Sequence, residues 1–120
     1  MSNYKKELGA KGETIALEYL KNKGYKILKT NYHTREGEID IITSFLDKII
    51  FIEVKTRASN RFGLGEEAID EKKLESLSLA AEKYLQENNL EDNSWQIDLL
   101  TIDFSRNREG KIKHLENITF

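Results

Sequence analysis

Two runs rich in β-branched residues, separated by four residues, constrain the fold of this sequence most strongly. Residues 37–43 read GEIDIIT and residues 48–56 read KIIFIEVKT. Such runs are typical of strands, and the short gap between them suits a hairpin turn. Because apolar residues occupy both faces of these runs, we expect a hairpin that is covered on both sides, as in a sheet sandwiched by helices.

The flanking segments predict two helices and three further strands. An apolar stripe predicts a helix over residues 5–23, which Gly24 would end in the left-handed conformation. A second helix is expected over residues 71–88, with Asp70 as its N-cap. The other expected strands span residues 25–31, 95–104 and 111–118. Because a helix separates the third and fourth strands, we expect a right-handed crossover and a mixed α/β sheet.

Composition excludes several classes of protein and of site. The 120 residues are 38% hydrophobic and 33% charged, which fits a single domain over residues 1–120. A formal net charge of −2 argues against a polybasic protein that binds by bulk charge. The sequence has no Cys and two His, so thiolate zinc sites and disulfides are excluded and a His-built zinc site nearly so.

The same composition predicts where the protein acts. The absence of Cys fits a reducing cytoplasm. The N-terminal residues lack the apolar core of a signal peptide, and the longest apolar run, residues 49–52, is too short to span a bilayer. We therefore expect a cytoplasmic protein with no membrane partner.

Charge is distributed unevenly along the chain. Residues 1–35 hold eight basic and three acidic side chains, whereas the remaining two thirds are acidic overall. A basic first third could face a polyanion, but the lysines could equally form the solvated face of an amphipathic helix.

Three charged residues lie within the apolar hairpin. A turn at residues 46–47 would place Asp40 directly opposite Glu53, and Lys55 would share the face of Glu53 because side chains alternate along a strand. Opposed side chains in such a pair lie about 4.5–5.5 Å apart at Cβ, so two carboxylates there need a cation between them or must take up a proton.

A hard divalent cation such as Mg²⁺ suits this pair, because it prefers carboxylate and water oxygens. Lys55 beside the metal could stabilise the extra negative charge of a phosphate, so this set of groups suffices to hydrolyse a phosphodiester. The alternative is an exposed ion pair between Glu53 and Lys55 with Asp40 solvated beside it. The apolar neighbours argue against that alternative, since charges in a covered hairpin are costly unless they pair or bind something.

These residues resemble a known nuclease signature. The runs GEIDII at residues 37–42 and FIEVKTR at residues 51–57 resemble the PD-(D/E)xK motif of restriction-endonuclease-like proteins, although Ile39 stands in place of the Pro. More narrowly, the chain is similar to the YraN-like family of small bacterial proteins. Further matches are Gly12-Glu13, Ala16, Tyr19-Leu20, Gly24-Tyr25, Asn31-Tyr32, Phe62-Gly63, Glu67-Ala68-Ile69, Lys73 and Ile97-Asp98.

The resemblance implies a restriction-endonuclease-like αβββαβ core of the Holliday-junction-resolvase type. It also implies that Asp40 and Glu53 are metal ligands, that Lys55 is the catalytic lysine and that Glu13 supplies a further acid from the first helix. The alternative for Glu13 is an exposed helix acid. Two positions depart from the family pattern, since His33 stands where Arg is common and Leu74 where Gln is common.

Four basic residues are candidates for contacts with nucleic acid. Arg57 and Arg61 flank the motif, and arginine matches phosphate oxygens well. Arg35 is the nearest arginine to the position held by His33, and Lys73 opens the second helix, where the helix dipole does not favour a cation. Each could also be an ordinary surface charge. His114, on the last strand, is expected to be exposed, and Asp98 to be structural.

Three functions remain open at this level. The first is a Mg²⁺- or Mn²⁺-dependent nuclease acting on DNA, including branched or nicked forms, with a homodimer suited to a symmetric substrate. The second is a nucleic-acid-binding accessory protein that keeps the fold but does not cleave. The third is a protein-interaction module that uses the acidic part of the chain. The motif indicates a fold and a site rather than a reaction.

Overall fold

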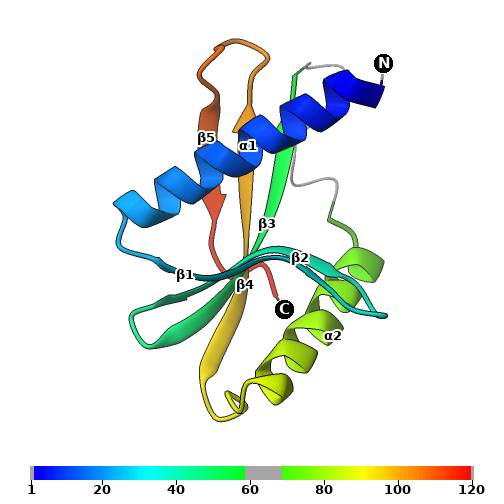
Figure 1. Cartoon of the computed structure of the whole chain (residues 1–120), viewed down its shortest axis with the longest axis vertical. Helices are drawn as coiled ribbons and strands as arrows, with labels where there is room; N and C mark the ends of the chain where they lie inside the picture. Colours follow the sequence, from blue (N-terminus) through cyan, green and yellow to red (C-terminus); the bar gives the residue numbers. More distant parts are fainter. Residues whose placement is uncertain (1, 59–68, 120) are drawn as a thin grey trace.

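The expected order of helices and strands is confirmed. The computed structural model describes residues 2–58 and 69–119, and Figure 1 shows their arrangement. The elements are α1 (Ser2–Asn22), β1 (Lys26–His33), β2 (Glu38–Phe45), β3 (Lys48–Arg57), α2 (Glu71–Glu87), β4 (Ser94–Asp103) and β5 (Lys111–Leu115).

The last strand is shorter than expected. It ends at Leu115 rather than at residue 118, because the backbone turns into a left-handed conformation at Asn117 (φ 50°). The Asn117 N–H donates to the carboxylate of Asp98 instead of continuing the ladder, and the Ile118 N–H then donates to the Ile97 carbonyl.

The five strands form one mixed sheet in the order β1-β2-β3-β4-β5. All neighbours are antiparallel except β3 and β4, which are parallel because α2 carries the chain from one end of the sheet back to the other. The fold is therefore α/β, as the sequence predicts, and it is compatible with the restriction-endonuclease-like core that the resemblance implies.

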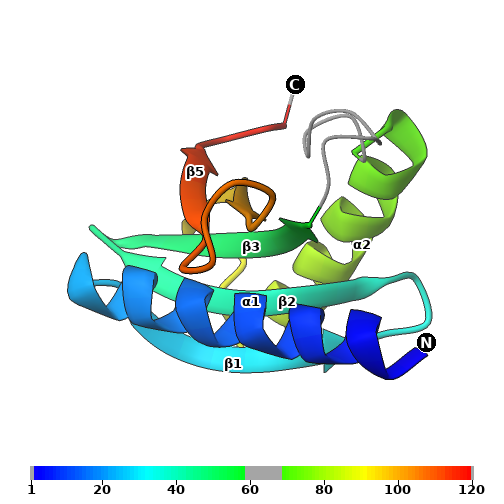
Figure 2. The same cartoon turned by 90° about the horizontal axis from the view of Figure 1, so that it is seen from above.

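The two helices cover opposite faces of the sheet, as Figures 1 and 2 show. One core cluster joins α1 to the face that carries Ile50 and Ile52, and the other joins α2 to the face that carries Ile49 and Phe51. Alternation along β3 thus supplies both cores from one strand. No helix in the described ranges has the length and apolar character needed to cross a membrane.

The β2–β3 hairpin has the register that the sequence predicts. Leu46 and Asp47 form the turn with φ values of 50° and 65°, which is the backbone of a two-residue hairpin loop. The ladder runs from the Phe45–Lys48 pair to the Ile41–Ile52 pair and stops there. The next two residues, Asp40 and Glu53, begin the candidate site.

Both helix boundaries follow the expected capping chemistry. Gly24 has a φ of 95°, and the N–H of Tyr25 donates back to the Leu20 carbonyl, which ends α1. The Asp70 side chain accepts a hydrogen bond from the Lys73 N–H at 2.8 Å, which begins α2. The second cap places Lys73 in the first turn of α2, beside the sheet.

Candidate active site

Glu53 and Lys55 lie on the face of the sheet that α2 covers. Phe51, two residues earlier on β3, packs in the same core cluster as residues of α2, and side chains alternate along a strand. The Glu53 side chain is only 5% exposed, whereas that of Lys55 is 35% exposed. Burial therefore falls along β3 from the carboxylate toward the amine, so the site opens at the Lys55 end.

Asp40 meets β3 where the hairpin ladder ends. Its Oδ2 accepts a hydrogen bond from the backbone N–H of Val54 at 2.8 Å, so a side chain takes the place of the next backbone pairing. The Asp40 side chain is thereby directed at β3 rather than at solvent. The carboxyl groups of Asp40 and Glu53 come into hydrogen-bonding contact.

The environment of Glu53 favours its protonated form. Burial, followed by the charge of Asp40 and a hydrogen bond with it, raises the pKa of Glu53 to about 7. Lys73 acts in the opposite direction, because an ammonium group favours the carboxylate. A carboxyl pair of this kind calls for a further positive charge, and a bound cation would supply it.

Two lysines approach the buried carboxylate from different elements. The Lys73 Nζ of α2 lies 3.2 Å from Glu53 Oε2, and the Lys55 Nζ of β3 lies 3.8 Å from the same oxygen. The sequence predicts nucleic-acid contact for Lys73, but its ion pair with Glu53 was missed. The available signal was its place beside Leu74 and one turn before Leu77, at the edge of the buried stripe.

Glu13 lies in α1, on the opposite face of the sheet from Lys73, and does not contact the carboxyl pair. Its Oε1 accepts a hydrogen bond from Asn31 Nδ2 at 3.1 Å. Asn31 lies opposite Asp40, between the Thr30–Ile41 and Tyr32–Ile39 pairs, and has a φ of 52°. Glu13 is therefore linked to the strand position of Asp40 through Asn31.

The three candidate arginines are placed differently from one another. Arg57 has its Nε 3.8 Å from Asp103 Oδ2, at the end of β3, with its side chain 18% exposed. Arg35 is exposed on the turn between β1 and β2, and Gly37 of that turn lies against the backbone of Ser76 in α2. Arg61 lies outside the described residues.

The donor set fits Mg²⁺ better than a metal that needs a full protein cage. Among the described residues, no three His, Cys, Asp or Glu side chains form a group that could hold a metal ion. Mg²⁺ is usually bound through one or two carboxylates together with waters and substrate phosphates. Asp40 and Glu53 provide two carboxylates, and a bound cation would reduce the repulsion between them.

The expectation for His114 is wrong, because this side chain is largely buried. Its Nε2 lies 2.7 Å from Asp98 Oδ2, with side-chain exposures of 10% and 0% respectively. Its Nδ1 lies 2.9 Å from the Tyr19 hydroxyl, so a chain of hydrogen bonds joins β4, β5 and α1. Asp98 is structural, as the sequence predicts, and this network lies on the face opposite the carboxyl pair.

The chain is similar to a group of bacterial proteins over most of its length. Residues 12–102 match a family model described as "Uncharacterised protein family UPF0102". A UPF0102 protein of Alkaliphilus oremlandii is 44% identical over 114 residues, covering 93% of this chain and 97% of that protein. UPF0102 proteins of Syntrophomonas wolfei and Clostridioides difficile are 43% and 39% identical over 112 residues, each alignment covering 93% of this chain and 96% of the relative.

Proposed function

The chain belongs to the UPF0102 family, which is the YraN-like family, and we propose that it is a metal-dependent nuclease that hydrolyses phosphodiester bonds of DNA. One observation carries the proposal. Asp40 and Glu53 bring their carboxyl groups together beside two ammonium groups in a partly buried site, and burial and mutual repulsion raise the pKa of Glu53 to about 7.

We propose further that the protein belongs to the PD-(D/E)xK superfamily. The supporting features are the α-β-β-β-α-β order, the mixed sheet, and the location of the acid–x–lysine motif on β3. The acid on β2 is displaced from the ladder toward that motif by its bond to the Val54 N–H. The motif can form a catalytic site only if the acid on β2 lies next to Glu53 and Lys55 on β3, and this bond holds it there.

Each charged group has a distinct role in this proposal. Asp40 and Glu53 would hold Mg²⁺ or Mn²⁺, and the bound ion would polarise a phosphate oxygen and lower the pKa of a water. Lys55 and Lys73 would stabilise the negative charge that develops on the phosphate. The low exposure of Glu53 excludes bulk water, which strengthens these interactions. Glu13, the further acid of the motif, would act indirectly by holding Asn31 at the strand position opposite Asp40.

The substrate proposal follows from the size and charge of the chain. Residues 1–35 carry the basic excess, and Arg35, Arg57 and Arg61 are the proposed contacts to the DNA backbone. One domain of this size has little room for a separate recognition module, so we propose branched or nicked DNA, with a homodimer for symmetric substrates.

A non-cleaving DNA-binding protein is the second candidate. The observation in its favour is that Lys73 Nζ lies 3.2 Å from Glu53 Oε2, so an ammonium group already partly neutralises the carboxylate. A metal would have to compete with that ion pair. The two candidates differ in whether the protein cleaves the DNA that it binds.

A cleavage assay separates the two candidates. Purified protein is incubated with linear, nicked and branched DNA in Mg²⁺ or Mn²⁺, beside Asp40→Asn and Lys55→Ala. We expect metal-dependent cleavage that falls at least about 100-fold in both variants, because electrostatic groups of this kind contribute that much. Lys83→Ala, an exposed lysine on α2, is the matched control and should cleave normally. DNA binding by all four proteins without cleavage of any substrate would favour the accessory role.

A further inference from the structure

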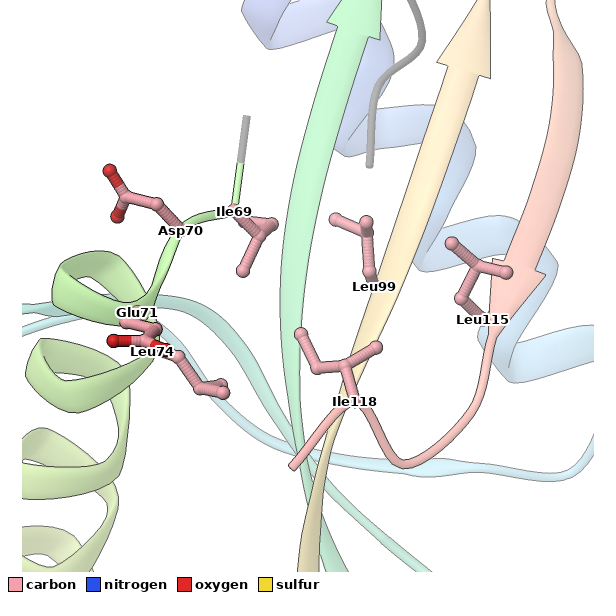
Figure 3. A pocket seen from close by; sticks show the side chains of 7 residues that line it. All are labelled: Ile69, Asp70, Glu71, Leu74, Leu99, Leu115 and Ile118. Atoms are coloured by element: carbon pink, nitrogen blue, oxygen red, sulfur yellow. The ribbon is translucent and has the colours of Figure 1, made fainter. Parts of the chain in front are cut away.

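A cavity of about 470 Å³ lies between the start of α2 and the far strands of the sheet, as Figure 3 shows. Its apolar lining comes from Ile69, Leu74, Leu99, Leu115 and Ile118. Asp70 and Glu71, at the start of α2, complete its described lining. The cavity therefore has an apolar interior, and Figure 3 shows that the Asp70 carboxylate points away from it.

The cavity adjoins the candidate active site on the same face of the sheet. Leu99 is the partner of Glu53 in the β3–β4 ladder, and Leu115 is the partner of Leu99 in the β4–β5 ladder. Neighbouring strands lie about 4.8 Å apart, so the two leucines lie about one and two strand spacings from Glu53. On the other side, Leu74 directly follows Lys73, which contacts Glu53.

The chemistry of the cavity selects an uncharged, flat group. The exposed carboxylates of Asp70 and Glu71 at its edge repel a phosphate, whereas Lys55 and Lys73 beside Glu53 attract one. A nucleobase has apolar faces that suit leucine and isoleucine walls. A phosphate beside Glu53 and its base against Leu99 or Leu115 would lie about one or two strand spacings apart, roughly 5–10 Å.

We propose that this cavity is a subsite for one unpaired nucleobase of the strand whose phosphate lies at the carboxyl pair. This inference rests on the proposed nuclease function and adds a substrate class, namely DNA with an unpaired nucleotide beside the scissile phosphate. A base within a duplex stays in the stack and cannot enter a side cavity without unstacking. The cavity therefore favours bulges, gaps and branch points over continuous duplex.

The test compares two DNA duplexes that differ only in one base. One carries a single bulged dC and the other carries an abasic site at the same position, so that backbone and charge are the same. Binding is measured by fluorescence anisotropy in Ca²⁺, a hard cation that prefers oxygen ligands. We expect the bulged dC duplex to bind about tenfold more tightly, because the faces of the base leave water for the apolar lining of the cavity.

Variants locate the effect in the cavity. Ile118→Trp and Leu115→Trp fill the cavity from two different segments, and each should reduce the difference between the two duplexes to less than twofold. Leu79→Trp places the same bulk on an exposed leucine of α2, outside the cavity lining, and should keep the full difference. Circular dichroism identifies any variant that does not fold. If one filling variant is unfolded, the other one tests whether the base preference depends on the cavity.

The outcomes separate this inference from the function on which it rests. Equal binding of the two duplexes, or a preference that both filling variants retain, would overturn the base subsite even if the protein cleaves DNA in Mg²⁺. Absence of both DNA binding and cleavage would overturn the nuclease function as well. A concentration-dependent dimer lost in Ile118→Trp and Leu115→Trp, without a base preference, would assign the cavity to a second copy of the chain instead.

Discussion

Glu53 experiences opposing electrostatic effects within a few ångströms. Burial and Asp40 raise its pKa to about 7 from an ordinary value of 4.5, while the Lys73 ammonium at 3.2 Å lowers it. The net effect leaves this carboxyl able to hold a proton near neutral pH. A cation that binds there must replace that proton, so metal binding and protonation of Glu53 exclude each other.

The raised pKa of Glu53 predicts how folding stability changes with pH. A pKa that is higher in the folded chain stabilises the fold fully below about pH 4.5, and this contribution is lost as pH rises through about 7. We expect Glu53→Gln, which stays neutral, to flatten the decline in the free energy of unfolding between those values by roughly 1–3 kcal/mol. Urea denaturation at a series of pH values measures the free energy of unfolding of both proteins.

The control for this experiment is an exposed glutamate of α2. Glu75→Gln removes a carboxylate of the same type at an exposed position of that helix, and its pH profile should follow that of the unchanged protein. If Glu53→Gln and the unchanged protein lose stability in parallel over this pH range, the environment described for Glu53 is wrong.

Some of the site could be predicted from individual residues and some could not. The face shared by Glu53 and Lys55, and the approach of Asp40, follow from alternation and from a turn at residues 46–47. The contact of Lys73 with Glu53 depends on how α2 crosses β3, which no local pattern specifies. The burial of His114 depends likewise on Tyr19 and Asp98, which are distant in the sequence.

Among the elements, α1 packs on β3 through a close approach at Gly12. A Cβ at this position would overlap the Cγ2 methyl of Thr56, while its contact with the Thr56 Cβ, at 3.5 Å, would be ordinary. Gly12 is buried within a long helix, where glycine is otherwise unfavourable. The tight fit, rather than the helix itself, therefore requires glycine at this position.

This close approach predicts that the effect of Gly12→Ala on the free energy of unfolding depends on the residue at position 56. Gly12→Ala should lower the free energy of unfolding by about 1–3 kcal/mol, as overpacking does. In a Thr56→Ser background the methyl is absent, and the same change should be neutral or stabilising by up to about 1 kcal/mol, because alanine favours a helix. Chemical denaturation of the unchanged protein, the two single variants and the double variant gives the double-mutant cycle. Equal destabilisation in both backgrounds would contradict the proposed overlap.

The elements themselves were largely predictable because their signals are local. Apolar periodicity, the Asp70 cap and Gly24 specify the helices, and β-branched runs specify the strands. The end of β5 was predicted too late, because it depends on a long-range contact. The Asn117 N–H bonds to Asp98 of β4, and this bond diverts the chain from the sheet.

At the scale of the whole molecule, Asp98 links the C-terminal part of the chain to the helix α1. Its buried carboxylate accepts hydrogen bonds from Gln96 Nε2 and the Asn117 N–H, both at 2.8 Å, and lies 2.7 Å from His114 Nε2. His114 in turn contacts the Tyr19 hydroxyl. A fully satisfied buried network of this kind couples elements that the chain order keeps apart.

Replacing the centre of this network and replacing its α1 end should have unequal effects on stability. Tyr19→Phe deletes one hydrogen bond at the partly exposed end and should cost about 1 kcal/mol of unfolding free energy. Asp98→Ala leaves His114, Gln96 and the Asn117 N–H without their acceptor and should cost about 3 kcal/mol or more. Thermal denaturation compares the two variants, and a Tyr19→Phe effect as large as that of Asp98→Ala would contradict the central role of Asp98.

The central claim is that Asp40 and Glu53 form a cation site that the Lys73 ammonium partly neutralises. Isothermal titration calorimetry with Mn²⁺ at pH 8, above the pKa of Glu53, tests it most directly. The unchanged protein should bind the metal, Asp40→Asn should lose at least tenfold in affinity, and Lys73→Ala should gain affinity because a competing cation is removed. No metal uptake by the unchanged protein and by Lys73→Ala, or equal uptake by Asp40→Asn, would contradict the claim.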